Sequence, residues 1–502
     1  MSNTTRIARN TMALYFRQIL IMLVSLYTVR VVLNTLGAED YGIYNVVAGV
    51  VVLFSFVNNA MATSVQRFLN FYLGKNDTEK TRNVYSASLV IHGVICLIFI
   101  VLAETAGLWF VNAKLNIPSE RSNAAFWCYQ AAVVTTFANI MRVPYNAVII
   151  AYEKMSFFAG LSIVEAILKL AVVFLLKIAQ FDKLIFYSFL LAGVSFVILA
   201  IYKFYCNKNF DIAHYKKFQD RGLGKEFVSF SGWSLFGAVA NVANSQGTNI
   251  VLNIFTNVTV NAAMGIANQV NAAVYSFVSN FQTAFNPQLV KSYAAGEKKE
   301  LNQLIFRASK FSFLLLWLIV LPLSLNLETV LTLWLKNVPG YSVVFVQLIL
   351  ICSLVDCMTY PIAVAVQASG NIKFYQIIIS CFIFANLPLS ILFLLVGMPP
   401  YSVLFIRFFL CLLILVFRVV YLNFSQSFPA KKFIFQVLLR CAVIVALSFF
   451  ITKLLTSHLL GLSYFLCSCL FSIFIIFVLS FLLLFTSEER KYAFSFIKRI
   501  RR

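Results

Sequence analysis

The stretch KFYCNKNFDIAHYKKFQDRGLGK, from Lys203 to Lys225, is the longest polar and basic interruption of an otherwise apolar chain of 502 residues. It separates two halves whose short motifs recur in the same order. The paired motifs are VVLN at 31–34 with IVLN at 250–253, GIYN at 42–45 with GIAN at 265–268, QRFLNFYLG at 66–74 with QLVKSYAAG at 288–296, and Pro144, Ala151 and Phe157-Phe158 with Pro361, Ala368 and Phe374-Tyr375. Several matches at nearly constant spacing indicate that one unit of about 200 residues occurs twice.

The composition identifies the class of protein. Hydrophobic residues make up 61% of the chain and charged residues only 12%, which is incompatible with the surface of a soluble domain. The net charge of +22 does not indicate a nucleic-acid partner, because Lys and Arg lie at the ends of apolar runs rather than in one patch. The chain is therefore predicted to be an all-α integral membrane protein.

Apolar runs of about 20 residues can each cross a hydrocarbon core as a helix. The sequence predicts fourteen such spans, at approximately 12–35, 41–70, 84–110, 123–151, 155–178, 184–205, 227–255, 260–290, 304–325, 342–368, 374–396, 402–423, 433–455 and 461–486. The amino terminus, the even-to-odd connections and the carboxyl tail hold about 25 Lys and Arg, against about 6 in the other connections, which predicts that both termini are cytoplasmic.

Six spans precede the basic stretch, so the two copies insert in the same orientation and form parallel repeats around a central cavity. We expect an N-terminal six-helix lobe at 1–205, a cytoplasmic linker at 206–226, a C-terminal six-helix lobe at 227–423, and helices 13 and 14 with a basic cytoplasmic tail at 424–502. Ile212, Tyr215, Phe218 and Phe227 among the charges of the linker suggest an amphipathic helix on the inner surface.

With this architecture, the segment TRIARNT before the first span and LGAEDYGIYNVV after it, the chain resembles the polysaccharide flippases of the multidrug, oligosaccharidyl-lipid and polysaccharide (MOP) exporter superfamily, which have a MATE-like fold. The resemblance is greatest to the O-antigen and capsule-repeat flippases of the bacterial cytoplasmic (inner) membrane. It implies a transporter that moves a polyprenyl-diphosphate-linked oligosaccharide from the inner to the outer leaflet by alternating access, with polysaccharide polymerase machinery as a candidate partner.

Ionisable side chains inside spans are costly and need an explanation. Among the cations of the predicted spans, the candidates for a functional role are Arg17, Arg30, Arg142, Lys169 and Arg407. Arg67, Lys177, Arg418 and Arg440 are interpreted as topology anchors. Acids inside the spans are few, chiefly Glu165 and Asp356. This excess of positive charge favours an anionic cargo. Arg17 and Arg142 lie deep without a partner nearby in the sequence, and they are the strongest candidates for binding substrate phosphate.

Each candidate also has a structural interpretation. Arg30 and Arg407 can snorkel to the outer interface, and Glu165 and Lys169, four residues apart, can neutralise each other on one helix face. Amides at Asn241, Asn244 and Asn268 suit sugar hydroxyls, although hydrogen bonds between helices are the ordinary role of such residues.

Asp356 lies mid-span, and Pro361 frees a backbone carbonyl one turn before itself. Together they suggest a site for Na⁺ or a proton, with Glu165 as a second ion-coupling candidate. An ion pair between Asp356 and a cation of the other lobe is the alternative.

No enzymatic signature is found: the sequence has no P-loop, no metal-ligand cluster among its three histidines, and no paired cysteines. We therefore expect no catalytic residue, no metal and no cofactor. Three other classes compete with this interpretation. A multidrug antiporter of the same superfamily would prefer an acid-lined pocket, whereas the buried charge here is of the opposite sign. A multispan glycosyltransferase or polymerase would need a large outer loop or interfacial acidic and histidine residues, and the sequence shows neither. A lipid-linked peptidoglycan-precursor flippase would share the diphosphate.

Overall fold

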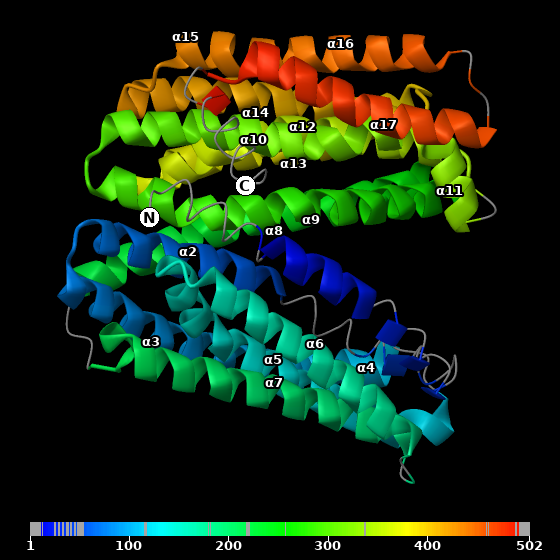
Figure 1. Ribbon diagram of the computed structural model, residues 1–502. Helices are drawn as coiled ribbons and strands as arrows, with labels where there is room; N and C mark the ends of the chain where they lie inside the picture. The colour runs from blue at the N-terminus through cyan, green and yellow to red at the C-terminus, as the bar shows by residue number, and fades with distance from the viewer. Residues whose placement is uncertain are drawn as a thin grey trace, which may run out of the picture. The chain divides into compact units, whose positions relative to one another are not determined.

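The computed structural model describes most of residues 12–490 (Figure 1). The residues that it does not describe are 1–11, 13, 25–26, 29–30, 33–34, 37–39, 41–42, 45–46, 48–54, 115–117, 179, 181, 217–220, 257, 336–337, 458, 460, 487–488 and 491–502. The described residues form helices and turns without a strand. The predicted all-α membrane fold is confirmed.

Ten helices in the described part of the chain are long and apolar enough to cross a membrane. The four remaining predicted spans coincide with helical segments that do not meet the same criterion: Leu14–Val24, α2 (Ser55–Gly74), α8 (Arg221–Phe255) and α9 (Val258–Ala294). Amides and other polar side chains reduce the hydropathy of α8 and α9, whereas gaps in the described residues shorten the first two segments.

The chain divides into two compact units. The first contains residues 1–239 and 293–295. Its helices are α2, α3 (Thr78–Leu102), α4 (Leu108–Lys114), α5 (Ser122–Ala151), α6 (Met155–Lys177), α7 (Lys183–Asn209) and the first half of α8, with π-helical turn η1 (Ala103–Gly107) and 3₁₀ turns η2 (Ser119–Arg121) and η3 (Asp211–Ala213). Helix α5 packs against α2, α3, α6 and α7, so its buried face forms the centre of this unit.

The second unit contains residues 240–292 and 296–502. Its helices are the remainder of α8, α9, α10 (Lys298–Leu325), α11 (Leu327–Leu335), α12 (Ser342–Ala368), α13 (Lys373–Leu395), α14 (Ser402–Gln426), α15 (Ala430–Phe433), α16 (Leu439–Thr456) and α17 (Gly461–Leu479), with π-helical turns η4 (Ile434–Leu438) and η5 (Ser480–Leu484). Helix α12 packs against α10 and α14 and is the most buried of the candidate spans.

The order of elements repeats along the chain. A short helix carrying a Leu and a Trp follows the third span in each half: α4 with Leu108 and Trp109, and α11 with Leu333 and Trp334. Pro144 lies inside α5, and Pro361 lies inside α12. Superposition of the two halves stays a prediction.

The expected amphipathic helix of the linker is wrong for the residues that the structure describes there. Residues Asp211–Ala213 form a single 3₁₀ turn, with Ile212 buried. Phe227 belongs to α8, where it is buried against Phe68 of α2. Phe218 lies outside the described residues. Ile212 and Phe227 pack into the first unit, because burial removes more apolar area from water than adsorption on a surface does, whereas Tyr215 is exposed.

An ion-pair triad joins three connections of the first unit. The Arg121 guanidinium donates to both carboxylate oxygens of Asp40, at 2.8 and 2.6 Å, and also to Asp182. Asp182 caps α7 by accepting from the backbone N–H groups of Leu184 and Ile185, each at 3.1 Å. Partial burial raises the pKa of Asp182, but the hydrogen bonds from Arg121 and the two N–H groups outweigh it and lower that pKa below its usual value.

A π-helical turn interrupts the third span at η1. The Tyr129 hydroxyl of α5 donates to the carbonyl of Ala103, at 2.7 Å, at the beginning of this turn. A Cβ on Gly107 would lie 2.1 Å from that hydroxyl oxygen. Glycine at this position therefore lets the tyrosine reach the carbonyl, and the bond fixes α3 against α5.

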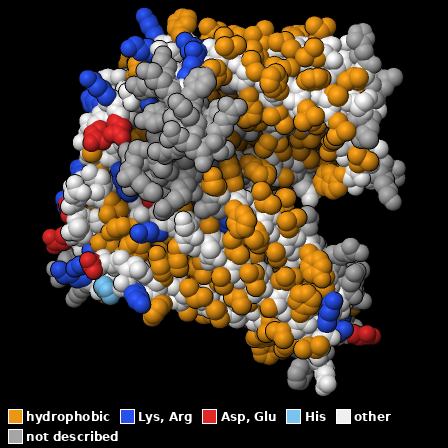
Figure 2. Space-filling model, viewed as in Figure 1, with side chains coloured by type: hydrophobic (Ala, Val, Ile, Leu, Met, Phe, Trp, Pro, Cys, Tyr) orange, Lys and Arg blue, Asp and Glu red, His pale blue; other side chains and the backbone are white. Residues whose placement is uncertain are grey.

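Hydrophobic side chains cover most of the visible helix surfaces, and the Lys and Arg side chains in that view gather near helix ends (Figure 2). Large apolar residues are exposed along the candidate spans, for example Phe409 at 63% and Leu470 at 68%. Such a surface is stable in hydrocarbon and not in water. The protein is therefore a multi-pass membrane protein.

Candidate functional site

A group of charged residues lies where α5, α6 and α7 pack together in the first unit. Glu165 of α6 accepts from Arg142 Nη1 of α5 at 2.9 Å, and its second oxygen accepts from Lys169 Nζ at 2.7 Å. The side chains are half-buried, with exposed fractions of 27% for Arg142, 21% for Glu165 and 45% for Lys169. One carboxylate thus holds two cations in place.

Arg17, in the helical segment Leu14–Val24, belongs to the same group. Its guanidinium carbon lies 4.8 Å from the ring centroid of Phe158 in α6, and the side chain is within electrostatic reach of Glu165 and Tyr202. Arg142 lies 5.8 Å from the ring centroid of Tyr202 in α7. We call Arg17, Arg142, Glu165 and Lys169 the cationic cluster.

The cationic cluster carries three positive charges and one negative charge. Glu165 therefore neutralises only part of it, and the excess lies in apolar helical segments, two of which are candidate membrane spans, where uncompensated charge is costly. The Nε group of Arg17 is buried and has no hydrogen-bond partner among the described residues. A buried donor without an acceptor is destabilising by about 1 to 3 kcal/mol, so an anion with several oxygens would stabilise this arrangement.

The structure confirms the sequence-based expectation of an ion pair in this group and adds a contact that the sequence does not show. The ion pair between Glu165 and Lys169, predicted from their spacing, is present. Arg142 has no partner nearby in the sequence, as predicted, but helix packing brings it to Glu165, 23 residues away on another helix. Arg30 lies outside the described residues.

The second unit has a different set of side chains at the corresponding positions. Arg142 precedes Pro144 by two residues, and Thr359 precedes Pro361 by two. Thr359 accepts from Arg418 Nη1 of α14 at 2.8 Å. Asp356 lies within electrostatic reach of Arg418, and both Asp356 and Arg407 are within such reach of Cys352. Asp356 therefore has a cation of its own unit, Arg418, within electrostatic reach.

The backbone carbonyl freed by Pro361 already has a donor. Proline lacks an N–H group, so the carbonyl of Cys357, four residues earlier, loses its helical partner. Gln282 Nε2 of α9 donates to this carbonyl at 3.4 Å. The oxygen expected to contribute to an ion site thus takes part in packing α9 against α12. The ion-coupling roles of Asp356 and Glu165 stay predictions.

The amide candidates of α8 and α9 lie in the second unit. Asn244 accepts from Asn386 Nδ2 of α13 at 2.9 Å, which is an interhelical hydrogen bond. Asn241 is exposed, and Asn268 is partly buried. Lys169 and Asn386 follow the paired aromatic residues Phe158 and Tyr375 at the same spacing. Positions at the same sequence spacing thus carry a charged group in one unit and an amide in the other.

Two polar residues of these sites were not predicted from the sequence as functional. Arg418 was interpreted as a topology anchor, although its place well inside the apolar run of α14 is a signal for a buried cation. Tyr202 could not be recognised as a site residue from the sequence, because tyrosine is common near membrane interfaces.

Comparisons with known proteins agree with this fold. The family model described as "Polysaccharide biosynthesis protein" matches residues 7–293. The chain is 20% identical over 330 residues to the uncharacterized membrane protein EpsK of Bacillus subtilis (strain 168). That match covers 65% of this chain and 64% of the length of the relative.

Solved structures of MATE transporters share the fold. A MATE in complex with MaD3S has a TM-score of 0.72 at 12% identity, covering 85% of this chain and 98% of that one. A MOP superfamily transporter from Pyrococcus furiosus has a TM-score of 0.71 at 12% identity, covering 86% of this chain and 97% of that one. With a MATE-like fold and a family model that matches more than half of its residues, the chain belongs to the polysaccharide biosynthesis protein family.

Proposed function

We propose that the protein is a flippase that moves a polyprenyl-diphosphate-linked oligosaccharide, such as an O-antigen or capsule repeat unit, from the inner to the outer leaflet by alternating access. The observation that carries this proposal is the excess positive charge of the cationic cluster within membrane-spanning helices. The family supports a role in making polysaccharides. The proposed location is the bacterial cytoplasmic membrane, with both termini in the cytoplasm.

The cationic cluster suits a diphosphate because of its donors. Each guanidinium presents a planar fork of N–H groups that can bind two phosphate oxygens together. Glu165 fixes Arg142 and Lys169 in position, which lowers the cost of ordering them when the substrate binds. Lys169, the most exposed of the paired groups, can exchange its carboxylate partner for phosphate.

A multidrug antiporter of the same superfamily is the main alternative. A cationic drug would be repelled by an excess of positive charge, whereas an anionic headgroup would be attracted. The similar transporter from Pyrococcus furiosus is described as having a binding pocket of reverse polarity, which suggests a different function for that protein. A peptidoglycan-precursor flippase would carry the same diphosphate, so only the identity of the glycan distinguishes it from our proposal.

Export of the glycan in cells tests the proposal. We expect Arg17→Ala with Arg142→Ala to reduce surface glycan at unchanged protein level, and the corresponding Lys variants to restore it only in part, since lysine lacks the planar fork. Lys208→Ala, which removes a charge from the exposed end of α7, serves as the matched control. Full surface glycan in the double alanine variant would rule out the proposed role of the cluster.

A further inference from the structure

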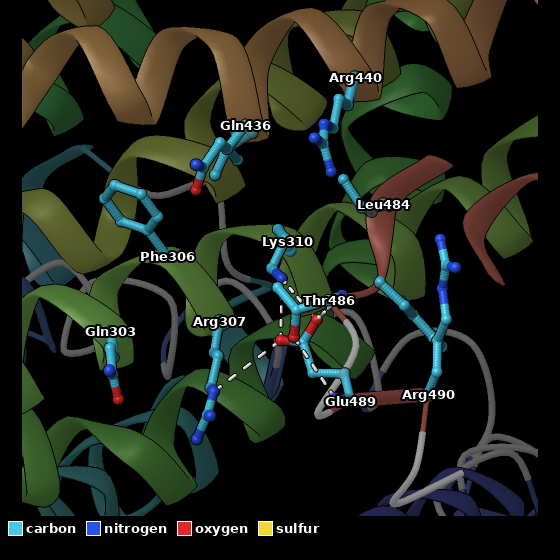
Figure 3. A pocket seen from close by; sticks show the side chains of 12 residues that line it. Gln303, Phe306, Arg307, Lys310, Gln436, Arg440, Leu484, Thr486, Glu489 and Arg490 are labelled. Carbon is cyan, nitrogen blue, oxygen red and sulfur yellow. Dashed lines mark hydrogen bonds and ion pairs between the residues drawn. The ribbon is translucent and has the colours of Figure 1, made fainter. Parts of the chain in front are cut away.

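A second cationic site, built from residues not considered so far, lies in the second unit. A cavity of about 590 Å³ opens where α10, the turn η4 with α16, and the end of η5 come together. Four cationic side chains and one carboxylate line it, namely Arg307, Lys310, Arg440, Arg490 and Glu489 (Figure 3). We call this cavity the basic pocket.

Glu489, the carboxylate that lines the basic pocket, already has partners of opposite charge. Lys310 Nζ donates to both oxygens of Glu489 at 2.8 Å, and Arg307 Nε lies 3.9 Å away. Thr486 and Glu489 also exchange hydrogen bonds in a capping box. Burial raises the pKa of Glu489, but the Lys310 and Thr486 bonds lower it below its usual value, so the group stays ionised.

Arg440 and Arg490 have no carboxylate partner among the described residues. Arg440 Nη1 donates to the carbonyl of Leu483 at 3.0 Å, and Arg490 Nη2 donates to that of Leu482 at 2.7 Å. These carbonyls belong to the π-helical turn η5, at the end of the last span. A guanidinium has five N–H donors, so most donors of both arginines remain available to a ligand.

The position of Arg440 within its span favours binding of an anion. It is exposed and follows Phe433 by seven residues, which places it about 10 Å into the apolar span at 1.5 Å per residue. An exposed cation at such depth is unfavourable in hydrocarbon unless it snorkels or meets a negative group. The backbone carbonyl of Leu483 supplies only a dipole.

An apolar groove continues from the basic pocket along α16. It has a volume of about 410 Å³, and its apolar lining comes from Phe435, Leu439 and Val443 on one side and from Leu482 and Leu483 on the other. Arg440 and Arg490 line the groove as well as the basic pocket. A polar end and an apolar end thus meet at the same two arginines.

We propose that the basic pocket and its groove bind an anionic phospholipid, with the headgroup phosphate at Arg440 and Arg490 and an acyl chain along Leu439, Val443 and Leu482. Basic pockets between membrane helices are suited to lipid phosphates. A soluble phosphate would fill the polar end but leave the groove empty, whereas a lipid fills both. This site is separate from the cationic cluster and does not depend on the proposed transport activity.

Equilibrium binding to the purified full-length protein tests this site. Native mass spectrometry would compare phosphatidylglycerol, phosphatidylcholine and inorganic phosphate. We expect selective retention of phosphatidylglycerol, with affinity reduced about 30-fold in Arg440→Gln with Arg490→Gln. Lys208→Gln with Lys453→Gln makes the same charge change at exposed positions elsewhere and should bind as the unmodified protein does.

A second variant keeps the charges and blocks the groove. Val443→Trp, at a position exposed by 39%, should remove the preference for phosphatidylglycerol while leaving both arginines in place. Three results would overturn the proposal: equal binding of the two lipids, unchanged lipid binding in the double glutamine variant, or inorganic phosphate binding as tightly as the anionic lipid.

Discussion

Glu165→Gln should change stability and anion binding in opposite directions. The variant removes the only carboxylate of the cationic cluster and leaves Arg17, Arg142 and Lys169 without an opposite charge. Removing one partner of a fully buried pair costs about 3 to 5 kcal/mol. Because these side chains are 21–45% exposed, we expect a loss of about 1 to 3 kcal/mol in the free energy of unfolding.

The same change should strengthen diphosphate binding. A phosphate about 8 Å from Glu165 is repelled by about 2 kcal/mol per unit charge at an effective dielectric constant of about 20. For a diphosphate of charge about −2, removing that repulsion gains about 4 kcal/mol. This gain exceeds the contribution of about 1 to 3 kcal/mol that Glu165 makes by ordering Arg142 and Lys169, so the affinity should rise about fivefold or more. Thermal unfolding in detergent and calorimetric titration with a short-chain isoprenyl diphosphate measure the two effects.

Glu79→Gln makes the same charge change at the exposed start of α3 and should alter neither quantity. If Glu165→Gln bound the diphosphate no more tightly than the unmodified protein, the cationic cluster would not be the phosphate site. An unchanged melting temperature would show that Glu165 does not organise the cluster.

Three further predictions concern other described residues. The pKa of Asp182 is lowered in the folded state, so the stability that its carboxylate contributes is present above the usual carboxyl pKa and is lost as the pH falls through the lowered value. Acid-unfolding curves of Arg121→Ala should therefore show a smaller loss of stability at low pH than those of the unmodified protein. Equal losses would contradict the triad. Gly107→Ala should displace the hydroxyl of Tyr129 and lower the free energy of unfolding by about 1 to 3 kcal/mol. In a double-mutant cycle measured by thermal unfolding, Gly107→Ala should cause no further loss of stability in a protein that already carries Tyr129→Phe. Asp356→Asn should abolish any dependence of reconstituted flipping on Na⁺ or pH, and unchanged dependence would remove this residue from ion coupling.

Much of the fold was predictable because membrane insertion imposes simple rules. Runs of apolar residues predicted where each helix lies, since every backbone polar group must be bonded within the helix in hydrocarbon. The linker was harder to predict. Its apolar side chains suggest surface adsorption in the sequence, but the folded unit offers Phe227 a buried position against Phe68.

The sites were predictable only where their residues are neighbours in the sequence. The Glu165 and Lys169 pair follows from helical spacing. Arg142 joins them from another helix, and this contact depends on packing that no local pattern encodes. The basic pocket is built from three distant segments, so Arg440 on its own indicated only topology.

Flipping by the purified protein in liposomes tests the central claim most directly. Outward movement of a diphosphate of charge about −2 across about 100 mV, negative inside, releases roughly 4.6 kcal/mol. We predict that a fluorescent polyprenyl-diphosphate oligosaccharide crosses the bilayer, faster at this potential, and that Arg17→Ala with Arg142→Ala abolishes the movement. The account would be contradicted if the purified protein did not move this lipid and instead exported a cationic drug.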